Sequence, residues 1–174
     1  GRLGRLESIE YVEGNVFGWP SATGFAVNPK ISSRGILMDL GAHVADTICW
    51  WLGGRPVLKE MRDDSYGGPE SVVRIKAEKD GCKISITLSR LSDLSNRYQV
   101  TGDRGRISGR IFDWKRVSLK DENRAMSVRK LASVSRNYPG FAVPIVENFL
   151  QVIQGRAQPL ISGSDVLDSI EFIH

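Results

Sequence analysis

The sequence is poor in the residues that hold disulfide frameworks and zinc sites, because it has only two cysteines and two histidines. Cys49 and Cys82 each lie in an apolar pattern with no second thiol or histidine nearby, so we expect two buried free thiols. With His43 and His174 as the only histidines, and no C-x-x-C or H-E-x-x-H motif, almost no zinc ligands are available. We expect no metal site, and no serine or cysteine nucleophile that a second histidine could activate.

Long apolar runs are also missing. The stretch T-I-C-W-W-L at residues 47–52 is far shorter than the ~20 residues that a membrane-spanning helix needs, and the first ten residues contain no apolar core of a signal peptide. We therefore expect a cytoplasmic protein with no membrane partner. The hydrophobic fraction of 41% and the charged fraction of 25% are typical of a globular chain, and the length predicts one domain over residues 1–174.

Positive charge is unevenly distributed along the chain. The net charge is +4, and residues 97–136 contain eleven Lys and Arg against four Asp and Glu. Such a region is either a solvated surface or a face that binds nucleic acid or a phosphorylated ligand. Because no pattern of stacking aromatic residues accompanies it, we expect no nucleic-acid partner.

Alternating apolar and polar residues, interrupted by turn residues, predict a sheet. The expected strands cover residues 6–12, 57–62, 71–78, 82–88, 97–101, 106–111 and 116–119, with a hairpin turn at Asp80-Gly81. Helical spacing predicts helices at 41–52, at 142–153 and after Ser162, and residues 18–34 read as a long irregular segment. We expect an α+β domain, in which a largely antiparallel open sheet of about six strands has helices packed on one face.

The first predicted helix carries three titratable residues. Asp39 lies near the expected N-cap, Gly53-Gly54 supply the stop, and helical spacing places Asp39, His43 and Asp46 on one face. In one interpretation Asp39 is an ordinary cap, His43 is a buried structural histidine and Asp46 is a solvated side chain. In the other, His43 exchanges a proton near neutral pH, as general acid/base catalysis requires. Trp50 and Trp51 are expected to pack in the core.

Three stretches resemble one family of enzymes. Residues 33–54, S-R-G-I-L-M-D-L-G-A-H-V-A-D-T-I-C-W-W-L-G-G, resemble the signature G-G-x-L-x-D-x-G-x-H-x-x-D-x-x-x-x-L-x-G of the glucose–fructose oxidoreductase, inositol dehydrogenase and rhizopine-catabolism (Gfo/Idh/MocA) family. Residues 3–10 are similar to its I-G-x-I-x-S-I-E stretch, residues 102–107 to its G-x-x-G-x-I turn, and residues 149–173 to its closing helices. Together these stretches extend over nearly the whole chain.

The resemblance implies the substrate-binding and oligomerisation domain of a two-domain NAD(P)-dependent oxidoreductase. NAD or NADP would be bound mainly by an N-terminal Rossmann domain, which this chain lacks, so the fragment alone should be inactive. The substrate would be a sugar, cyclitol or related polyol, and the sheet face would join a homodimer or homotetramer. His43 would exchange the proton of the reacting hydroxyl, and Asp39 would orient His43 or hold the substrate. Further substrate-binding candidates are Arg34, Trp19 and Asp46.

The sequence also departs from the family pattern. No two glycines are separated by one residue, so G-x-G-x-x-G cannot occur, and no Glu-Lys-Pro stretch supplies the family's lysine. Arg34 stands where the family has glycine, and it could reshape the loop or add a cation for an anionic substrate. Trp19 and Phe25 could line a sugar pocket or simply pack. The apolar periodicity continues to His174, which suggests a fragment.

Two other functions stay open at this point. A non-catalytic sugar sensor or regulator on the same fold would keep the pocket without using His43 as an acid or base. A basic nucleic-acid-binding module is the more distant alternative.

Overall fold

The computed structural model of the protein describes residues 2–16, 18, 28, 30–32, 35–66, 68–113, 115–121, 126–130 and 138–174. One open sheet of eight strands organises them, in the order β2-β3-β4-β1-β5-β6-β7-β8. The strands are β1 (Leu6–Gly14), β2 (Val57–Asp63), β3 (Val72–Lys79), β4 (Cys82–Ser89), β5 (Arg97–Gly102), β6 (Gly105–Arg110), β7 (Arg116–Lys120) and β8 (Met126–Lys130). The α+β class and the largely antiparallel sheet are confirmed, whereas the expected count of about six strands was too low.

The first strand of the chain lies in the middle of the sheet. β1 pairs with β4 in parallel and with β5 in antiparallel orientation, and every other neighbouring pair of strands is antiparallel. The carboxyl ends of β1 and β4 therefore lie side by side, with Gly14 opposite Ser89. This shared end of the two strands carries several of the polar residues described below.

The hairpin between β3 and β4 forms where turn chemistry predicts it. Asp80 and Gly81 have φ values of 50° and 81°, which suit the two central positions of a tight hairpin turn. The turn sets the register Lys79 to Cys82, and alternate residues of both strands then face the same layer. The buried side chains on this inner face are Val73, Ile75, Ala77, Cys82, Ile84, Ile86 and Leu88.

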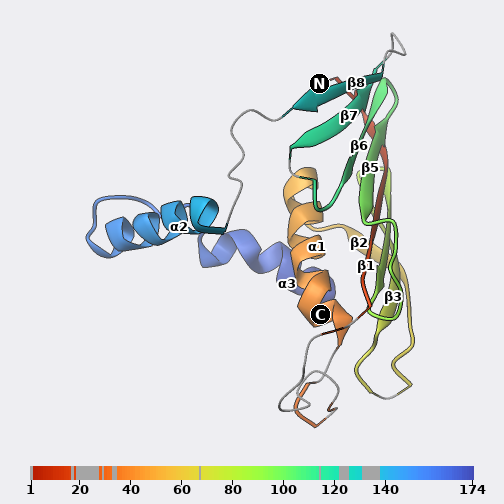
Figure 1. Ribbon diagram of the computed structural model, residues 1–174, viewed down its shortest axis with the longest axis horizontal. Coiled ribbons are helices and arrows are strands. Elements are labelled where there is room, and N and C mark those ends of the chain that lie inside the picture. The colour runs from red at the N-terminus through yellow and green to blue at the C-terminus, as the bar shows by residue number, and fades with distance from the viewer. Residues whose placement is uncertain are drawn as a thin grey trace.

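Helix α1 (Ile36–Leu52) covers the inner face of the sheet, and α3 (Leu167–Ile173) packs beside α1 (Figure 1). Val44, Ala45 and Ile48 of α1 are buried against the sheet, and Phe172 and Ile173 of α3 join the same core. Gly41 of α1 is buried, and an added Cβ would lie 2.9 Å from Leu37 Cδ1 of the same helix, which would have to shift, and at an ordinary contact distance of 3.5 Å from Leu88 Cδ1 of β4. Both cysteine thiols are buried, as expected.

Two expectations for α1 were wrong in detail. The helix begins at Ile36 with Gly35 as its N-cap residue, so Asp39 lies in the first turn and is not the cap. Its end agrees with the prediction, because Gly53 adopts a left-handed conformation with φ of 63°. Trp50 is 78% exposed and does not enter the core, whereas Trp51 packs on Tyr98 with ring centroids 5.2 Å apart. Successive helical residues point about 100° apart, so only one of the pair can face the sheet.

Helix α2 (Tyr138–Ile153) projects away from the sheet, so only α1 and α3 fit the expectation of helices packed on one face (Figure 1). The short 3₁₀ helix η2 (Gly163–Val166) leads into α3, and the Ser162 and Asp165 side chains form a capping box at its start. Within the described residues, no helix combines the length and the apolar character needed to cross a membrane.

Candidate active site

The start of α1 is fixed by a carboxylate from a distant loop. Glu70, which precedes β3 and is 7% exposed, accepts hydrogen bonds from the backbone N–H groups of Gly35 and Leu37, each at 2.9 Å. Its carbonyl oxygen accepts a third bond, from the Ile36 N–H, also at 2.9 Å. These contacts satisfy amides that the helix itself leaves unpaired, which is why α1 begins five residues before residue 41. The start of the helix is thereby anchored at the end of the sheet.

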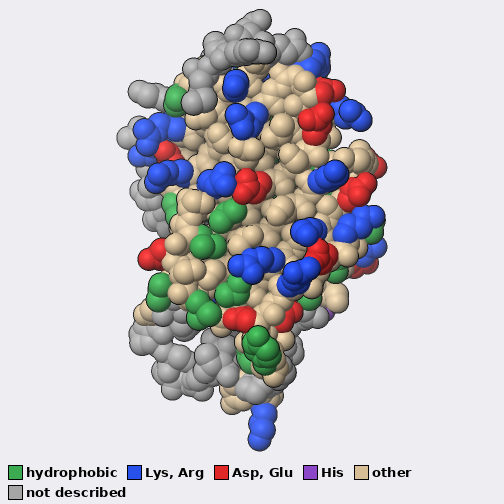
Figure 2. Space-filling view, turned by 90° about the vertical axis from the view of Figure 1, so that its right-hand side faces the viewer, with side chains coloured by type: hydrophobic (Ala, Val, Ile, Leu, Met, Phe, Trp, Pro, Cys, Tyr) green, Lys and Arg blue, Asp and Glu red, His purple; other side chains and the backbone are tan. Residues whose placement is uncertain are grey.

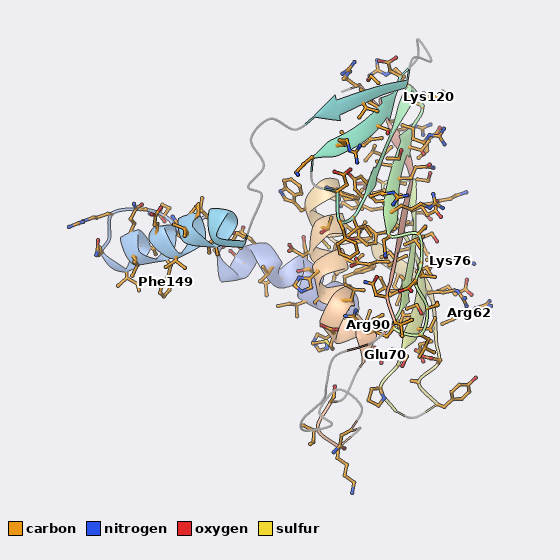
Figure 3. The ribbon with its side chains drawn as sticks, in the orientation of Figure 1. Arg62, Glu70, Lys76, Arg90, Lys120 and Phe149 are labelled. Atoms are coloured by element: carbon orange, nitrogen blue, oxygen red, sulfur yellow. The ribbon has the colours of Figure 1, made fainter. Side chains whose placement is uncertain are left out.

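Arg90 brings Asp39 to the same end of the sheet. It follows β4, and its Nη2 group donates a hydrogen bond to Asp39 Oδ2. The loop that carries Arg90 is held by Ser89, whose Oγ accepts bonds from the N–H groups of Leu91 at 3.1 Å and Ser92 at 3.2 Å. Figure 3 shows Arg90 and Glu70 beside the first turn of α1. Asp39 is therefore bound to a cation from the sheet, which sequence spacing did not reveal.

His43 lies one turn further along α1 and is exposed, as is Asp46. The interpretation of His43 as a buried structural histidine is therefore wrong. Its backbone carbonyl accepts a hydrogen bond from Thr47 Oγ1 at 2.9 Å. Asp39, His43 and Asp46 share the solvent side of the helix, as their spacing predicts.

A second carboxylate lies on the sheet beneath this helix. Glu13, the penultimate residue of β1, is only 5% exposed. Its Oε2 accepts a hydrogen bond from the Tyr11 hydroxyl at 3.1 Å. Burial raises the pKa of Glu13, while the Tyr11 hydrogen bond and the positive charges of Arg90 and His43 act in the opposite direction. Burial and the neighbouring Glu13 carboxylate also raise the pKa of Tyr11.

The structure thus brings together charged groups from three elements. Glu13 comes from β1, Arg90 from the segment after β4, and Asp39 and His43 from α1. Sequence reasoning identified the two α1 residues and missed the other two. The alternation that places Ile9 and Tyr11 on the inner face also places Glu13 there, so a strand prediction extended past residue 12 would have found it. Arg90 and Glu70 contact α1 only through the tertiary fold, and the sequence carries no local signal for them.

The remaining candidates are not placed. Trp19, Phe25 and Arg34 lie outside the described residues. Within the part of the chain that the structure describes, no group of three His, Cys, Asp or Glu side chains could hold a metal ion. This end of the fold therefore presents an exposed imidazole, an ion-paired carboxylate and a buried carboxylate.

Several solved structures with the same fold are described as oxidoreductases or dehydrogenases. The aldose–aldose oxidoreductase of Caulobacter crescentus, complexed with glycerol, is 19% identical with a TM-score of 0.78, covering 99% of this chain and 53% of that chain. A levoglucosan dehydrogenase in complex with NADH and levoglucosan is 14% identical, with a TM-score of 0.77. The match covers 99% of this chain and 56% of that chain. An oxidoreductase from Desulfitobacterium hafniense, described as NADPH-dependent, is 18% identical, with a TM-score of 0.72. The match covers 98% of this chain and 53% of that chain.

At these identities the structural matches establish the fold alone, and this chain spans about half the length of the structures it matches. A search of curated proteins finds no match. The family assignment comes from sequence instead: residues 1–108 match the model described as the GFO/IDH/MocA C-terminal domain. Because that match spans more than half of the chain, the protein belongs to the Gfo/Idh/MocA family and carries the C-terminal domain of these oxidoreductases.

Proposed function

We propose that this chain is the substrate-binding and acid/base half of an NAD(P)-dependent oxidoreductase that acts on a CH–OH group of a sugar, cyclitol or related polyol. The observation that carries the proposal is the position of His43: an exposed imidazole on α1, one helical turn after Asp39, whose carboxylate binds Arg90. Family membership supports the reaction class. The bound glycerol and levoglucosan of two structural matches support a polyol substrate.

The proposed role of His43 is to exchange the proton of the reacting hydroxyl. An imidazole gains and loses a proton near neutral pH, and it must reach the substrate to do so. Exposure of His43 satisfies that second condition. Asp46, exposed on the same face, is proposed to bind a substrate hydroxyl, and Arg34 and Trp19 remain proposed substrate contacts.

The residues of this chain do not fit a dinucleotide. The sequence contains no G-x-G-x-x-G turn with which a Rossmann fold cradles a pyrophosphate. A nicotinamide cofactor accepts or supplies a hydride when bound, and we assign its binding to a separate N-terminal domain. Structural matches described as NADPH-dependent or complexed with NADH support such a cofactor. The chain alone is expected to be inactive.

Helix α2 supports this division of the enzyme. Its exposed apolar residues include Val146, Phe149 and Ile153, which recur at helical intervals. Figure 3 shows Phe149 on this helix, away from the sheet. A helix that exposes such a stripe normally packs against another structural element. We propose that the dinucleotide-binding domain covers part of this helix.

The outer face of the sheet is proposed to join two or four copies of the protein. It is open and polar, and Figure 2 shows Lys and Arg side chains spread across it with fewer Asp and Glu. Exposed members include Arg74, Lys76 and Lys83, and Glu10 and Glu60 are already bound to Arg97 and Lys76. Because Lys and Arg outnumber Asp and Glu on this face, two copies of it repel each other, and since salt screens that repulsion we expect association to strengthen as salt is added. Light scattering that shows only monomers at high concentration and high salt would contradict it.

Turnover tests the proposed reaction. The chain, joined to a dinucleotide-binding domain, should reduce NAD or NADP when it is supplied with a panel of sugars and cyclitols. A protein that binds these compounds with no turnover would instead be a sugar sensor. Tight, strongly salt-dependent oligonucleotide binding without turnover would favour the nucleic-acid-binding module.

A further inference from the structure

Arg90 reaches the candidate active site from a restrained point of the backbone. It is the first residue after β4, and its N–H group donates to the Ser71 carbonyl oxygen at 2.8 Å. Ser89, which precedes it, is only 3% exposed, and its hydroxyl accepts the N–H groups of Leu91 and Ser92. The backbone on both sides of Arg90 is thus hydrogen-bonded, and the side chain extends from there to the first turn of α1 (Figure 3).

The guanidinium group of Arg90 is arranged in a way that stability alone does not explain. The Arg90 side chain is 21% exposed, and its Nε atom is buried and has no hydrogen-bond partner among the described residues. A buried donor without an acceptor destabilises a fold, so its presence calls for an explanation. Nη2 of the same group binds Asp39 Oδ2, although the Asp39 side chain is 54% exposed. An ion pair with so exposed a carboxylate contributes little to stability, because water also solvates the carboxylate.

Asp39 is not needed as a cap for the helix in which it lies. Gly35 is the N-cap residue of α1, and Glu70 already accepts the N–H groups of residues 35–37. Among the residues that the structure describes, Arg90 is the only hydrogen-bond partner of the Asp39 side chain, and it binds Oδ2. One carboxylate oxygen is therefore bound to a cation from the sheet, while Oδ1 stays available to another partner.

We propose that Arg90 is a positioning residue of the candidate active site, which holds the Asp39 carboxylate in one orientation, one helical turn before the exposed His43. A carboxylate that is fixed in advance loses less conformational entropy when a ligand binds than one that samples several rotamers. Arg90 touches neither substrate nor cofactor in this role, and it acts only through Asp39. The catalytic consequence rests on the proposed function, whereas the restraint on Asp39 does not.

The restraint can be measured in the chain itself by NMR, without substrate or cofactor. The three-bond couplings between Hα and the Hβ atoms of Asp39 report its χ1 angle, and in the parent they should indicate one rotamer. Arg90→Met keeps an apolar stem but removes the charge, so these couplings should change to the average of several rotamers. The couplings of Asp46, exposed on the same helix, should not change. A single Asp39 rotamer in folded Arg90→Met would overturn the proposal.

Stability distinguishes a positioning role from a structural one. In Arg90→Met, water can solvate the half-exposed Asp39 carboxylate, and the buried, unpaired Nε donor is removed. We therefore expect the equilibrium constant of unfolding to change by less than about fivefold, measured by urea denaturation. An increase in that constant of about a hundredfold or more would assign the ion pair to the fold and overturn the proposal.

Arg116→Met is the matched control variant. Arg116, the first residue of β7, forms an ion pair between its Nε atom and Asp113 Oδ2 at 2.7 Å. The same change of residue type there removes an ion pair that does not involve α1. The Asp39 couplings should therefore stay as they are in the parent.

A second variant serves if Arg90→Met does not fold. The Asp39 side chain is 54% exposed, so Asp39→Asn should fold normally. Rotation about the Nε–Cζ bond of Arg90 is slowed while Nη2 binds a carboxylate, and loss of that charge should speed the rotation at least ~threefold, measured by nitrogen-15 exchange NMR. Unchanged rotation in folded Asp39→Asn would equally overturn the proposal.

Enzyme kinetics separate this inference from the proposed function. In the two-domain enzyme, Arg90→Met should lower kcat/KM about tenfold or more, and Arg90→Lys, which keeps the charge, should recover part of that loss. Arg116→Met should retain the kcat/KM of the parent. A released Asp39 side chain in Arg90→Met, without any turnover in the parent enzyme, would refute the proposed function alone. Turnover in the parent that Arg90→Met leaves unchanged would refute the positioning role alone.

Discussion

Gly35 and Glu70, 35 residues apart in sequence, meet at the start of α1, where the Gly35 N–H donates to Glu70 Oε2 at 2.9 Å. The approach is so close that a Cβ on Gly35 would lie 1.9 Å from the Glu70 carbonyl oxygen. The absence of a side chain at residue 35 thus allows the loop before β3 to cap the helix. Correct placement of Asp39 and His43 depends on this contact.

Replacing Glu70 by alanine should destabilise the fold. The change removes two hydrogen bonds to a carboxylate and leaves the amides of Gly35 and Leu37 without these partners. We expect a loss of about 2 kcal/mol in the free energy of unfolding, measured by urea denaturation. Glu78→Ala is the control, because Glu78 forms only a surface ion pair with Lys59 and should change stability by less than about 0.5 kcal/mol. Equal effects of the two changes would contradict the capping role.

Replacing His43 by alanine in the two-domain enzyme should reduce kcat about a hundredfold or more, since the proton-exchanging group is lost. His43 is exposed, so stability and the dissociation constant of the cofactor should change little. His174→Ala provides the comparison and should retain turnover. Parent-like kcat in His43→Ala would remove His43 from the mechanism.

Stability should depend on pH through Glu13. Burial, the largest influence, raises its pKa above the ordinary value of 4.5. Because the folded chain then holds this proton more tightly than the unfolded chain, the contribution to stability is complete below the unfolded-state pKa. It is lost as the pH rises through the folded-state pKa. We expect the unfolding free energy of the parent, relative to Glu13→Gln, to fall over that window.

Urea denaturation at a series of pH values, starting near pH 4, measures this difference. Glu10→Gln should show no such trend relative to the parent, because Glu10 is a surface residue bound to Arg97. A difference between parent and Glu13→Gln that is constant with pH would mean that burial does not perturb this carboxyl group.

Both cysteines should be unreactive while the protein is folded. Burial raises the pKa of Cys49 to about 11 and raises that of Cys82 as well. Only the thiolate attacks thiol reagents, so modification near pH 8 should be at least ~100-fold slower than in urea-unfolded chain. Mass spectrometry after timed iodoacetamide treatment distinguishes the two rates. Rapid labelling of Cys49 in the folded state would contradict its buried position.

Local chemistry made much of this fold predictable. The Asp80-Gly81 turn, the left-handed Gly53 at the end of α1 and the alternation of β3 and β4 are each determined by a few neighbouring residues. The spacing of Asp39, His43 and Asp46 likewise identified one face of the helix. The edge strand β8 escaped prediction because it is only five residues long, so the apolar–polar alternation of Met126, Ser127, Val128 and Arg129 is a weak signal.

Long-range contacts account for the rest. The start of α1 depends on Glu70, and the environment of Asp39 depends on Arg90, which lies 51 residues further along the chain. The parallel pairing of β1 with β4 likewise joins two segments that are distant in the chain, and no local pattern in either segment predicts the pairing. The position of Glu13 on the inner face could have been predicted, since the alternation of β1 places it there. Its surroundings could not, because they depend on residues that only the tertiary fold brings near it.

The central place of β1 also has a consequence for synthesis of the protein. This strand is made before the other strands of the sheet, yet its two neighbours, β4 and β5, are made only after α1, β2 and β3. Until then both of its hydrogen-bonding edges are open to other chains. Folding of the sheet must therefore wait until β5 has been made, and the nascent chain is most prone to aggregation in the interval between the synthesis of β1 and that of β5.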